Sequence, residues 1–198
     1  LDHLLGPENG AKVLAQRRLG GGRIHHAMRT IAQCKLAFDM MCERALSRES
    51  HGKIIGEHQM VQEKIADSWM QMEQFRLILL RTAWLIDKHN DYLRVRKDIA
   101  AVKAAMPKVL HDIASRALHI HGSLGVSAEM PFMGQITSAF IMGLADGPTE
   151  VHKITLAKQV LRGYKPTTEL FPDYSLIKRR DAAIKKYAGR LERDIVEL

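Results

Sequence analysis

The chain has 198 residues, of which 46% are hydrophobic and 26% are charged, which is enough for one domain with a buried core. No apolar run reaches the roughly 20 residues of a membrane-spanning helix, and no signal peptide opens the sequence. The formal net charge of +8 suits acidic partners, but aromatic residues make up only 6% of the chain, so we expect no nucleic-acid ligand held by base stacking.

The spacing of apolar residues predicts three long helices. Apolar side chains recur every three or four positions over 24–45, 61–86 and 99–120. A loop at 47–56 and a turn at 87–92 separate these segments. Pro107 predicts a kink, not a break, in the third helix.

The stretch "LGGGR" at 19–23 is where the first of these helices is expected to begin. The free N–H groups of a helix start can receive an anion, and Arg23 would add a full charge there. The alternative is that Arg23 is only a solvated residue of a first turn.

The second half of the chain predicts shorter elements. A glycine-bearing loop at 121–131 precedes a short helix at about 132–143. Asp146, Gly147 and Pro148 then form a corner, and Pro148 suits the first turn of a helix that begins near Thr149. A linker at 163–175 leads to a basic helix at 177–193.

No strand-like alternation of useful length is found, so the fold class is predicted to be all-α. Long helices with short connections pack as an up-down helical bundle, which we place at 1–165. The remainder, 166–198, is predicted to be a linker and an extra, peripheral basic helix at the C-terminal end.

Several kinds of site are not supported by the sequence. Glu-x-x-His pairs of di-metal bundles are absent, and the histidines lack a cysteine or carboxylate at ligand spacing, so we expect no metal. Neither glycine-rich stretch follows a strand, as a dinucleotide fingerprint requires, and no Gly-x-Ser-x-Gly elbow is present. Cys34 and Cys42 lie eight positions apart on or beside an apolar seam, so we predict packing rather than a disulfide or a nucleophile.

Asp146 remains as a carboxylate at a stiff corner, either in a surface turn or as a base held over a substrate. Three stretches around it resemble, in order, the C-terminal domain of the acyl-CoA dehydrogenases. "SRESHGKIIGEHQ" (47–59) is similar to that family's Arg-x-x-Phe-Gly loop, and "ALHIHGSLGVS" (117–127) to its Gln-x-x-Gly-Gly-x-Gly loop. "ADGPTEVHKITLAKQVL" (145–161) is similar to its acid-Gly-Thr segment and final helix.

The resemblance spans about residues 4–165. "VKAAMP", "LADGP" and "EVHK" are similar to the family 10/11-like branch, in which an Asp stands where most members have Glu. The resemblance implies an FAD-dependent dehydrogenation of an acyl-CoA to a trans-2-enoyl-CoA, with an electron-transferring flavoprotein as acceptor. It also implies a homo-dimer or homo-tetramer, and N-terminal helical and central β domains that this sequence does not contain.

The same resemblance assigns residues. Asp146 corresponds to the catalytic base, and Gly22 to a position at which some members carry the base instead, an alternative that glycine excludes. Arg23 and Gly147 correspond to the acyl-CoA pocket. The residues that correspond to the FAD site, usually with the loop arginine reaching a neighbouring subunit, are Arg48, Ser50, His58, Gln59, His119, His121, Gly122, Ser123, Thr149 and Glu150.

Departures from the family pattern are His51 for Phe, His119 for Gln, Ser123 and Leu124 for Gly-Asn, Pro148 for Thr and Glu150 for Gln. The absence of a disulfide framework favours an intracellular location, which would be the cytoplasm of a bacterium or a mitochondrion or peroxisome of a eukaryote. A competing hypothesis is a non-catalytic helical assembly or binding module that uses the basic C-terminal helix.

Overall fold

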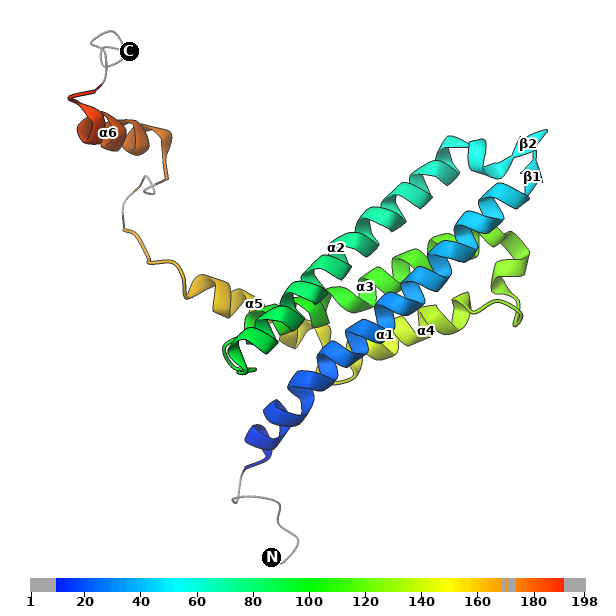
Figure 1. Cartoon of the computed structure of the whole chain (residues 1–198), viewed down its shortest axis with the longest axis horizontal. Coiled ribbons are helices and arrows are strands. Elements are labelled where there is room, and N and C mark those ends of the chain that lie inside the picture. Colours follow the sequence, from blue (N-terminus) through cyan, green and yellow to red (C-terminus); the bar gives the residue numbers. More distant parts are fainter. Residues whose placement is uncertain (1–9, 169, 171–173, 191–198) are drawn as a thin grey trace, which may run out of the picture. The chain divides into compact units, whose positions relative to one another are not determined.

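The computed structural model describes residues 10–168, 170 and 174–190, and it confirms the all-α fold class (Figure 1). The first of two compact units ends at Leu161, and its helices are α1 (Ala11–Ser47), α2 (Gln59–His89), α3 (Arg96–His121), α4 (Phe132–Leu144) and α5 (Thr149–Leu161). The second unit contains α6 (Leu176–Tyr187). This basic helix ends earlier than predicted, and the predicted positions 191–193 lie outside the described residues.

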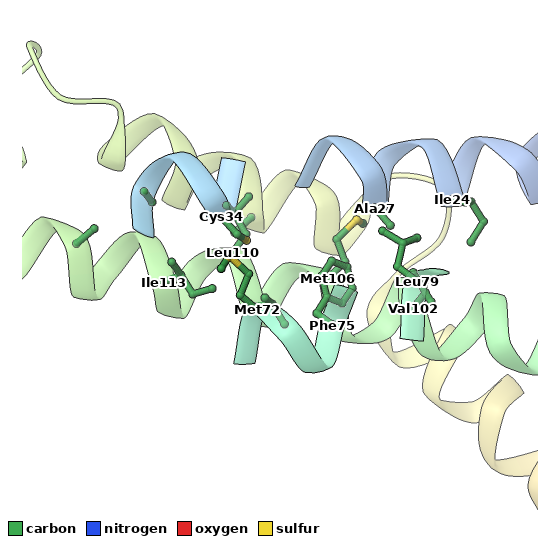
Figure 2. Close-up of a cluster of buried hydrophobic side chains, with 14 of the residues drawn as sticks. Ile24, Ala27, Cys34, Met72, Phe75, Leu79, Val102, Met106, Leu110 and Ile113 are labelled. Carbon is green, nitrogen blue, oxygen red and sulfur yellow. The ribbon is translucent and has the colours of Figure 1, made fainter. Parts of the chain in front are cut away.

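The core of the first unit lies around α3, which packs against α1, α2, α4 and α5. The predicted apolar seams supply it, with side chains of three helices meeting between the ribbons (Figure 2). α3 continues on both sides of Pro107, so the proline does not break the helix, as predicted. Representative buried residues are Ile24, Ala27, Cys34, Met72, Phe75, Leu79, Val102, Met106, Leu110 and Ile113.

The start of α1 differs from the prediction. α1 begins at Ala11, so Gly20, Gly21 and Gly22 lie inside the helix and no helix N-terminus is present at 19–23. The predicted anion site at a helix start there is therefore wrong. A Cβ on Gly20 would lie 2.9 Å from Cδ1 of Tyr92, so the glycine leaves room for that ring. Packing against a distant residue has overridden the low helix propensity of glycine.

The loop between α1 and α2 contains a short antiparallel pair of strands, β1 (Glu49–Ser50) and β2 (Lys53–Ile54). His51 and Gly52 connect them with φ angles of 54° and 77°, the left-handed values that a two-residue hairpin turn requires. A 3₁₀ helix at Ile55–Glu57 follows. Two-residue strands are too short to give an alternating pattern, which is why no strand was predicted.

The two cysteines are free, as predicted, and Cys34 is fully buried in the core. Burial raises the pKa of the Cys34 thiol to about 12, so it is protonated at neutral pH and is no nucleophile. Cys42 is only partly buried, and its pKa is also raised, chiefly by burial. None of the helices in the described part of the chain is both long and apolar enough to cross a bilayer.

Gly125 is predicted to be irreplaceable for packing. It lies in the 3₁₀ helix Gly122–Val126 after α3, and a Cβ there would lie 2.3 Å from the carbonyl oxygen of Leu118. Gly125→Ala should therefore lower the free energy of unfolding by about 1–3 kcal/mol, the usual cost of overpacking. Urea denaturation would measure this change.

Gly134→Ala in α4 is the matched control, because nothing lies within 4 Å of its added Cβ. Alanine is the better helix former, so this variant should gain up to about 1 kcal/mol. Equal stability of the two variants would contradict the assignment of Gly125 to close packing.

Candidate functional site

Asp146 lies in the corner between α4 and α5. The chain leaves the helical path at Ala145, and Asp146 and Gly147 follow with φ angles of 56° and 103°. Asp is among the few residues that tolerate the left-handed region. A Cβ on Gly147 would lie 3.1 Å from Nε2 of His152, so glycine is required both by backbone conformation and by space.

The backbone of this corner is held by two side chains. Nε of Arg23 on α1 donates to the carbonyl oxygen of Asp146 at 3.2 Å. Nε2 of His152 on α5 lies 3.2 Å from the same oxygen, and it must carry the proton because a carbonyl can only accept. His152 is buried, and burial is the main cause that lowers its pKa, with the bond to Asp146 acting against it. The corner is therefore clamped between α1 and α5.

The carboxylate of Asp146 lies against α1. Its Oδ2 is 3.4 Å from Nε2 of His26, and the Asp146 side chain is 21% exposed. A Cβ on Gly22 would lie 3.8 Å from the same oxygen. Positions 22 and 26 are one helical turn apart on α1 and share a face, so both point toward the carboxylate. His26 was not predicted as part of the site.

A buried lysine was also missed from the sequence. Lys103 lies in the middle of α3 and is 1% exposed, although lysine is among the residues least often fully buried. Its Nζ donates to the carbonyl oxygen of Met142 in the last turn of α4. Burial lowers the pKa of Lys103, while the charge of Asp146 acts to raise it. A lysine between Val102 and Met106 in an apolar seam was the available signal.

Four of the residues that resemble FAD contacts line a hollow elsewhere on the bundle. The hollow has a volume of about 790 Å³ and is formed by the β1–β2 loop, the start of α2 and the end of α3. Ser50, His58, Gln59 and His119 line it together with cationic side chains. Hydroxyl, amide, imidazole and ammonium groups can all donate to phosphate oxygens. The donor set therefore fits the phosphate part of a nucleotide cofactor.

The β1–β2 turn orders part of this hollow. Oγ of Ser50 lies 2.9 Å from Nδ1 of His51, and Nε2 of His58 lies 3.4 Å from the carbonyl oxygen of Ser50. Arg48 caps the C-terminal end of α1, and its side chain is exposed beside the hairpin. Lys53 and Lys64 are the lysines that line the hollow.

Other predicted residues lie apart from this hollow. His121 is buried, with its ring 4.7 Å from the ring of Phe132 and its Nδ1 2.8 Å from the carbonyl oxygen of Ala117. Gly122 ends α3 with a φ of 65°, and Ser123 is exposed after it. The described contacts of His121 are thus with the bundle itself.

Thr149 and Glu150 belong to the first turn of α5. Oγ1 of Thr149 donates to the carbonyl oxygen of Gly143 at 3.3 Å, which joins the start of α5 to the end of α4. Glu150 is exposed, and both residues line a second hollow of about 710 Å³ between α2, α3, α4 and α5. Among residues 10–168, 170 and 174–190, no cluster of three His, Cys, Asp or Glu side chains is arranged to hold a metal ion.

Known proteins are similar to this chain both in sequence and in fold. The family model described as acyl-CoA dehydrogenase, C-terminal domain, matches residues 8–161. Acyl-CoA dehydrogenase family member 11 of Rattus norvegicus is 40% identical over 159 residues, which are 80% of this chain and 20% of that protein. Acyl-CoA dehydrogenase family member 10 of Mus musculus is 38% identical over 159 residues, 80% of this chain and 15% of that protein.

A solved structure shows the same arrangement of helices. Butyryl-CoA dehydrogenase from Megasphaera elsdenii superposes with a TM-score of 0.73 at 26% identity, over 80% of this chain and 40% of that one. The chain thus spans a fifth or less of the length of the two curated relatives described above, and less than half of the solved enzyme.

Proposed function

This chain belongs to the acyl-CoA dehydrogenase family and contains the C-terminal domain of that family, and we propose that it supplies the catalytic base of an acyl-CoA dehydrogenase. The reaction would be FAD-dependent α,β-dehydrogenation of an acyl-CoA thioester to a trans-2-enoyl-CoA. One observation carries the proposal: the carboxylate of Asp146 faces position 22 of α1. The resemblance implies that family members carry the base at one of these two positions. In this chain a Cβ at position 22 would lie 3.8 Å from Oδ2 of Asp146, so a base at either position would reach the same place.

Asp146 would take a proton from Cα of the thioester as hydride leaves Cβ. FAD, when bound, would accept that hydride. A general base must be held within hydrogen-bond reach of the proton it removes. The clamps on the Asp146 carbonyl from Arg23 and His152 would give the carboxylate this fixed position. Arg23, which contacts the Asp146 carbonyl, and Gly147, which follows Asp146 in the chain, are the residues predicted to lie in the acyl-CoA pocket.

The FAD residues support an assembly of more than one chain. Arg23 and Arg48 are 25 positions apart along α1, which corresponds to about 37 Å at about 1.5 Å per residue. We propose that the two groups serve different FAD molecules. The Asp146 end would face the flavin held by its own subunit, and the Arg48 loop with its hollow would contact the pyrophosphate of a neighbour's FAD. A homo-dimer or homo-tetramer would be required.

The remaining parts of the proposal rest on the family alone. The electron acceptor would be an electron-transferring flavoprotein, and the location would be the cytoplasm of a bacterium or a mitochondrion or peroxisome of a eukaryote. Anaerobic mixing of the complete enzyme with a series of acyl-CoA thioesters would test the activity. The yellow flavin should bleach with at least one of them. A flavin that none of them reduces would overturn the proposal and favour a non-catalytic binding module.

Arg48→Ala in the complete enzyme should weaken the retention of FAD. The substitution would remove a charge-assisted contact with a phosphate, of the kind whose loss costs about tenfold or more in affinity. FAD content after exhaustive dialysis, read from the visible spectrum, would measure this. Arg94→Ala is the control, because Arg94 is also exposed but lies in the turn between α2 and α3. Equal FAD content in both variants would show that Arg48 is only a solvated loop residue.

A further inference from the structure

Lys103 is among the largest fully buried side chains of the described residues, and its role is not explained by the core around it. Burying an ammonium group costs free energy unless hydrogen bonds or an opposite charge compensate for it. An apolar side chain of similar length would avoid this cost in a seam otherwise built from residues such as Val102 and Met106. The lysine is therefore expected to do something that an apolar residue would not.

Its hydrogen bond joins the core of α3 to the end of α4. The last carbonyl groups of a helix have no intrahelical partner. Here the chain turns away at Ala145 and Asp146, so the amide of Asp146 is not in the helical position to reach Met142. Nζ of Lys103 donates to the Met142 carbonyl oxygen in its place.

Neighbouring carbonyl groups of the same turn are also occupied. The amide of Ala145 donates to the Ile141 carbonyl at 2.9 Å, and Oγ1 of Thr149 donates to that of Gly143 at 3.3 Å. The Asp146 carbonyl accepts from Arg23 and His152. α1, α3 and α5 thus each contribute side-chain donors to the carbonyl groups of Met142, Gly143 and Asp146.

The charge of Lys103 also links it to the Asp146 corner. The charge of Asp146 acts to raise the pKa of both Lys103 and Arg23, whereas the charge of Arg23 acts to lower the pKa of Lys103. A hydrogen bond from a charged donor is stronger than one from a neutral donor. An ammonium group inside the bundle therefore fixes the end of α4 more firmly than a backbone contact would.

We propose that Lys103 is a positioning residue for Asp146, which holds the last turn of α4 and so fixes where the carboxylate stands. The proposal rests on the proposed function of Asp146 as the base. Lys103 is not expected to touch the substrate, since it is buried below the corner.

Lys103→Met in the complete flavoenzyme is the test. Met keeps the length of the side chain and removes the donor and the charge. The rate of flavin reduction at saturating acyl-CoA should fall at least about tenfold, since small displacements of a catalytic group have effects of this size. KM and FAD content should stay unchanged. The thermal midpoint should stay within a few degrees of the wild type or rise, because a buried charge has been removed. A fall in rate matched by a large fall in the midpoint would indicate a merely structural lysine and overturn the proposal.

Lys108→Met is the matched control on the same helix. Lys108 is 77% exposed and pairs with Asp112, so its loss should leave the reduction rate and the midpoint unchanged. A Lys103→Met enzyme that behaves like this control would also overturn the proposal.

Hydrogen exchange in the chain itself gives a second readout that needs no catalysis. In Lys103→Met, the amides of Ala145 and His152 should exchange at least about tenfold faster, while amides in the middle of α2 keep their rates. Unchanged exchange at the corner would overturn the proposal whatever the role of Asp146. A different outcome would be faster exchange at the corner in Lys103→Met together with normal flavin reduction by the Asp146→Asn enzyme. That result would refute Asp146 as the base, and with it the catalytic positioning role of Lys103.

Discussion

Asp146→Asn in the complete flavoenzyme should retain bound, yellow FAD but reduce its flavin with acyl-CoA at least about a hundredfold more slowly, the usual scale for the loss of a general base. The amide has the shape of the carboxylate but cannot accept the proton. The backbone contacts of Arg23 and His152 use the carbonyl of residue 146, so they survive the substitution. Stopped-flow absorbance of the flavin under anaerobic conditions would give the rate.

Two further variants make this test specific. Asp39→Asn changes an exposed carboxylate on α1 that pairs with Lys35, and it should keep the wild-type rate. Gly22→Glu, added to Asp146→Asn, should restore part of the activity, because a side chain at position 22 points to the place of the missing carboxylate. Near-native bleaching by the Asp146→Asn enzyme would remove Asp146 from the mechanism.

The second large effect concerns the outer face of α2. The inner face buries Ser68, Met72, Phe75, Leu79 and Thr82. A second stripe of large apolar side chains lies on another face, with the Glu73–Arg76 ion pair between its first two members. Trp69, Leu77, Leu80 and Trp84 are 54%, 63%, 53% and 55% exposed. Large apolar patches rarely remain in water. The sequence already required this in part, since Ile78, Leu79 and Leu80 are consecutive and cannot all face one core.

We expect the 198-residue chain to self-associate through this stripe. Leu77→Glu combined with Leu80→Glu should convert it to a monomer, because two buried carboxylates would face the partner's apolar side chains. Light scattering during gel filtration would give the mass, and circular dichroism should show unchanged helix content. Leu93→Glu, in the turn after α2, is the control, since Leu93 is 62% exposed outside the stripe.

A wild-type chain that is strictly monomeric at high concentration would contradict the assembly. The same preparation tests the need for other domains. The 198 residues correspond to less than half of the solved enzyme, and we expect them not to hold FAD by themselves, so the protein should be colourless after incubation with FAD and dialysis against buffer. A stoichiometric yellow protein would show that the bundle needs no other domain to hold its cofactor.

Much of the fold followed from local patterns. The helical seams were predictable because burying one face of a helix imposes a repeat of three or four residues that is visible in the sequence. The corner at Asp146 and the start of α5 at Thr149 were predictable from another local effect. Gly147 and Pro148 restrict or permit backbone conformations only within a few residues of themselves. The motifs also indicated the acyl-CoA dehydrogenase family, and the family model and the curated relatives confirm this membership.

The surroundings of Asp146 were beyond such reasoning. Arg23 and the Asp146 carbonyl are 123 positions apart, and Lys103 and Met142 are 39 apart, so their contacts depend on how whole helices pack. The start of α1 was mistaken because Tyr92, which occupies the space beside Gly20, is remote in sequence. The separation of Arg48 and its hollow from the acid likewise depends on the unbroken length of α1. Sterics and periodicity act between near neighbours and can be read along the chain, whereas a buried lysine or a shared carbonyl arises from the packing of helices in three dimensions.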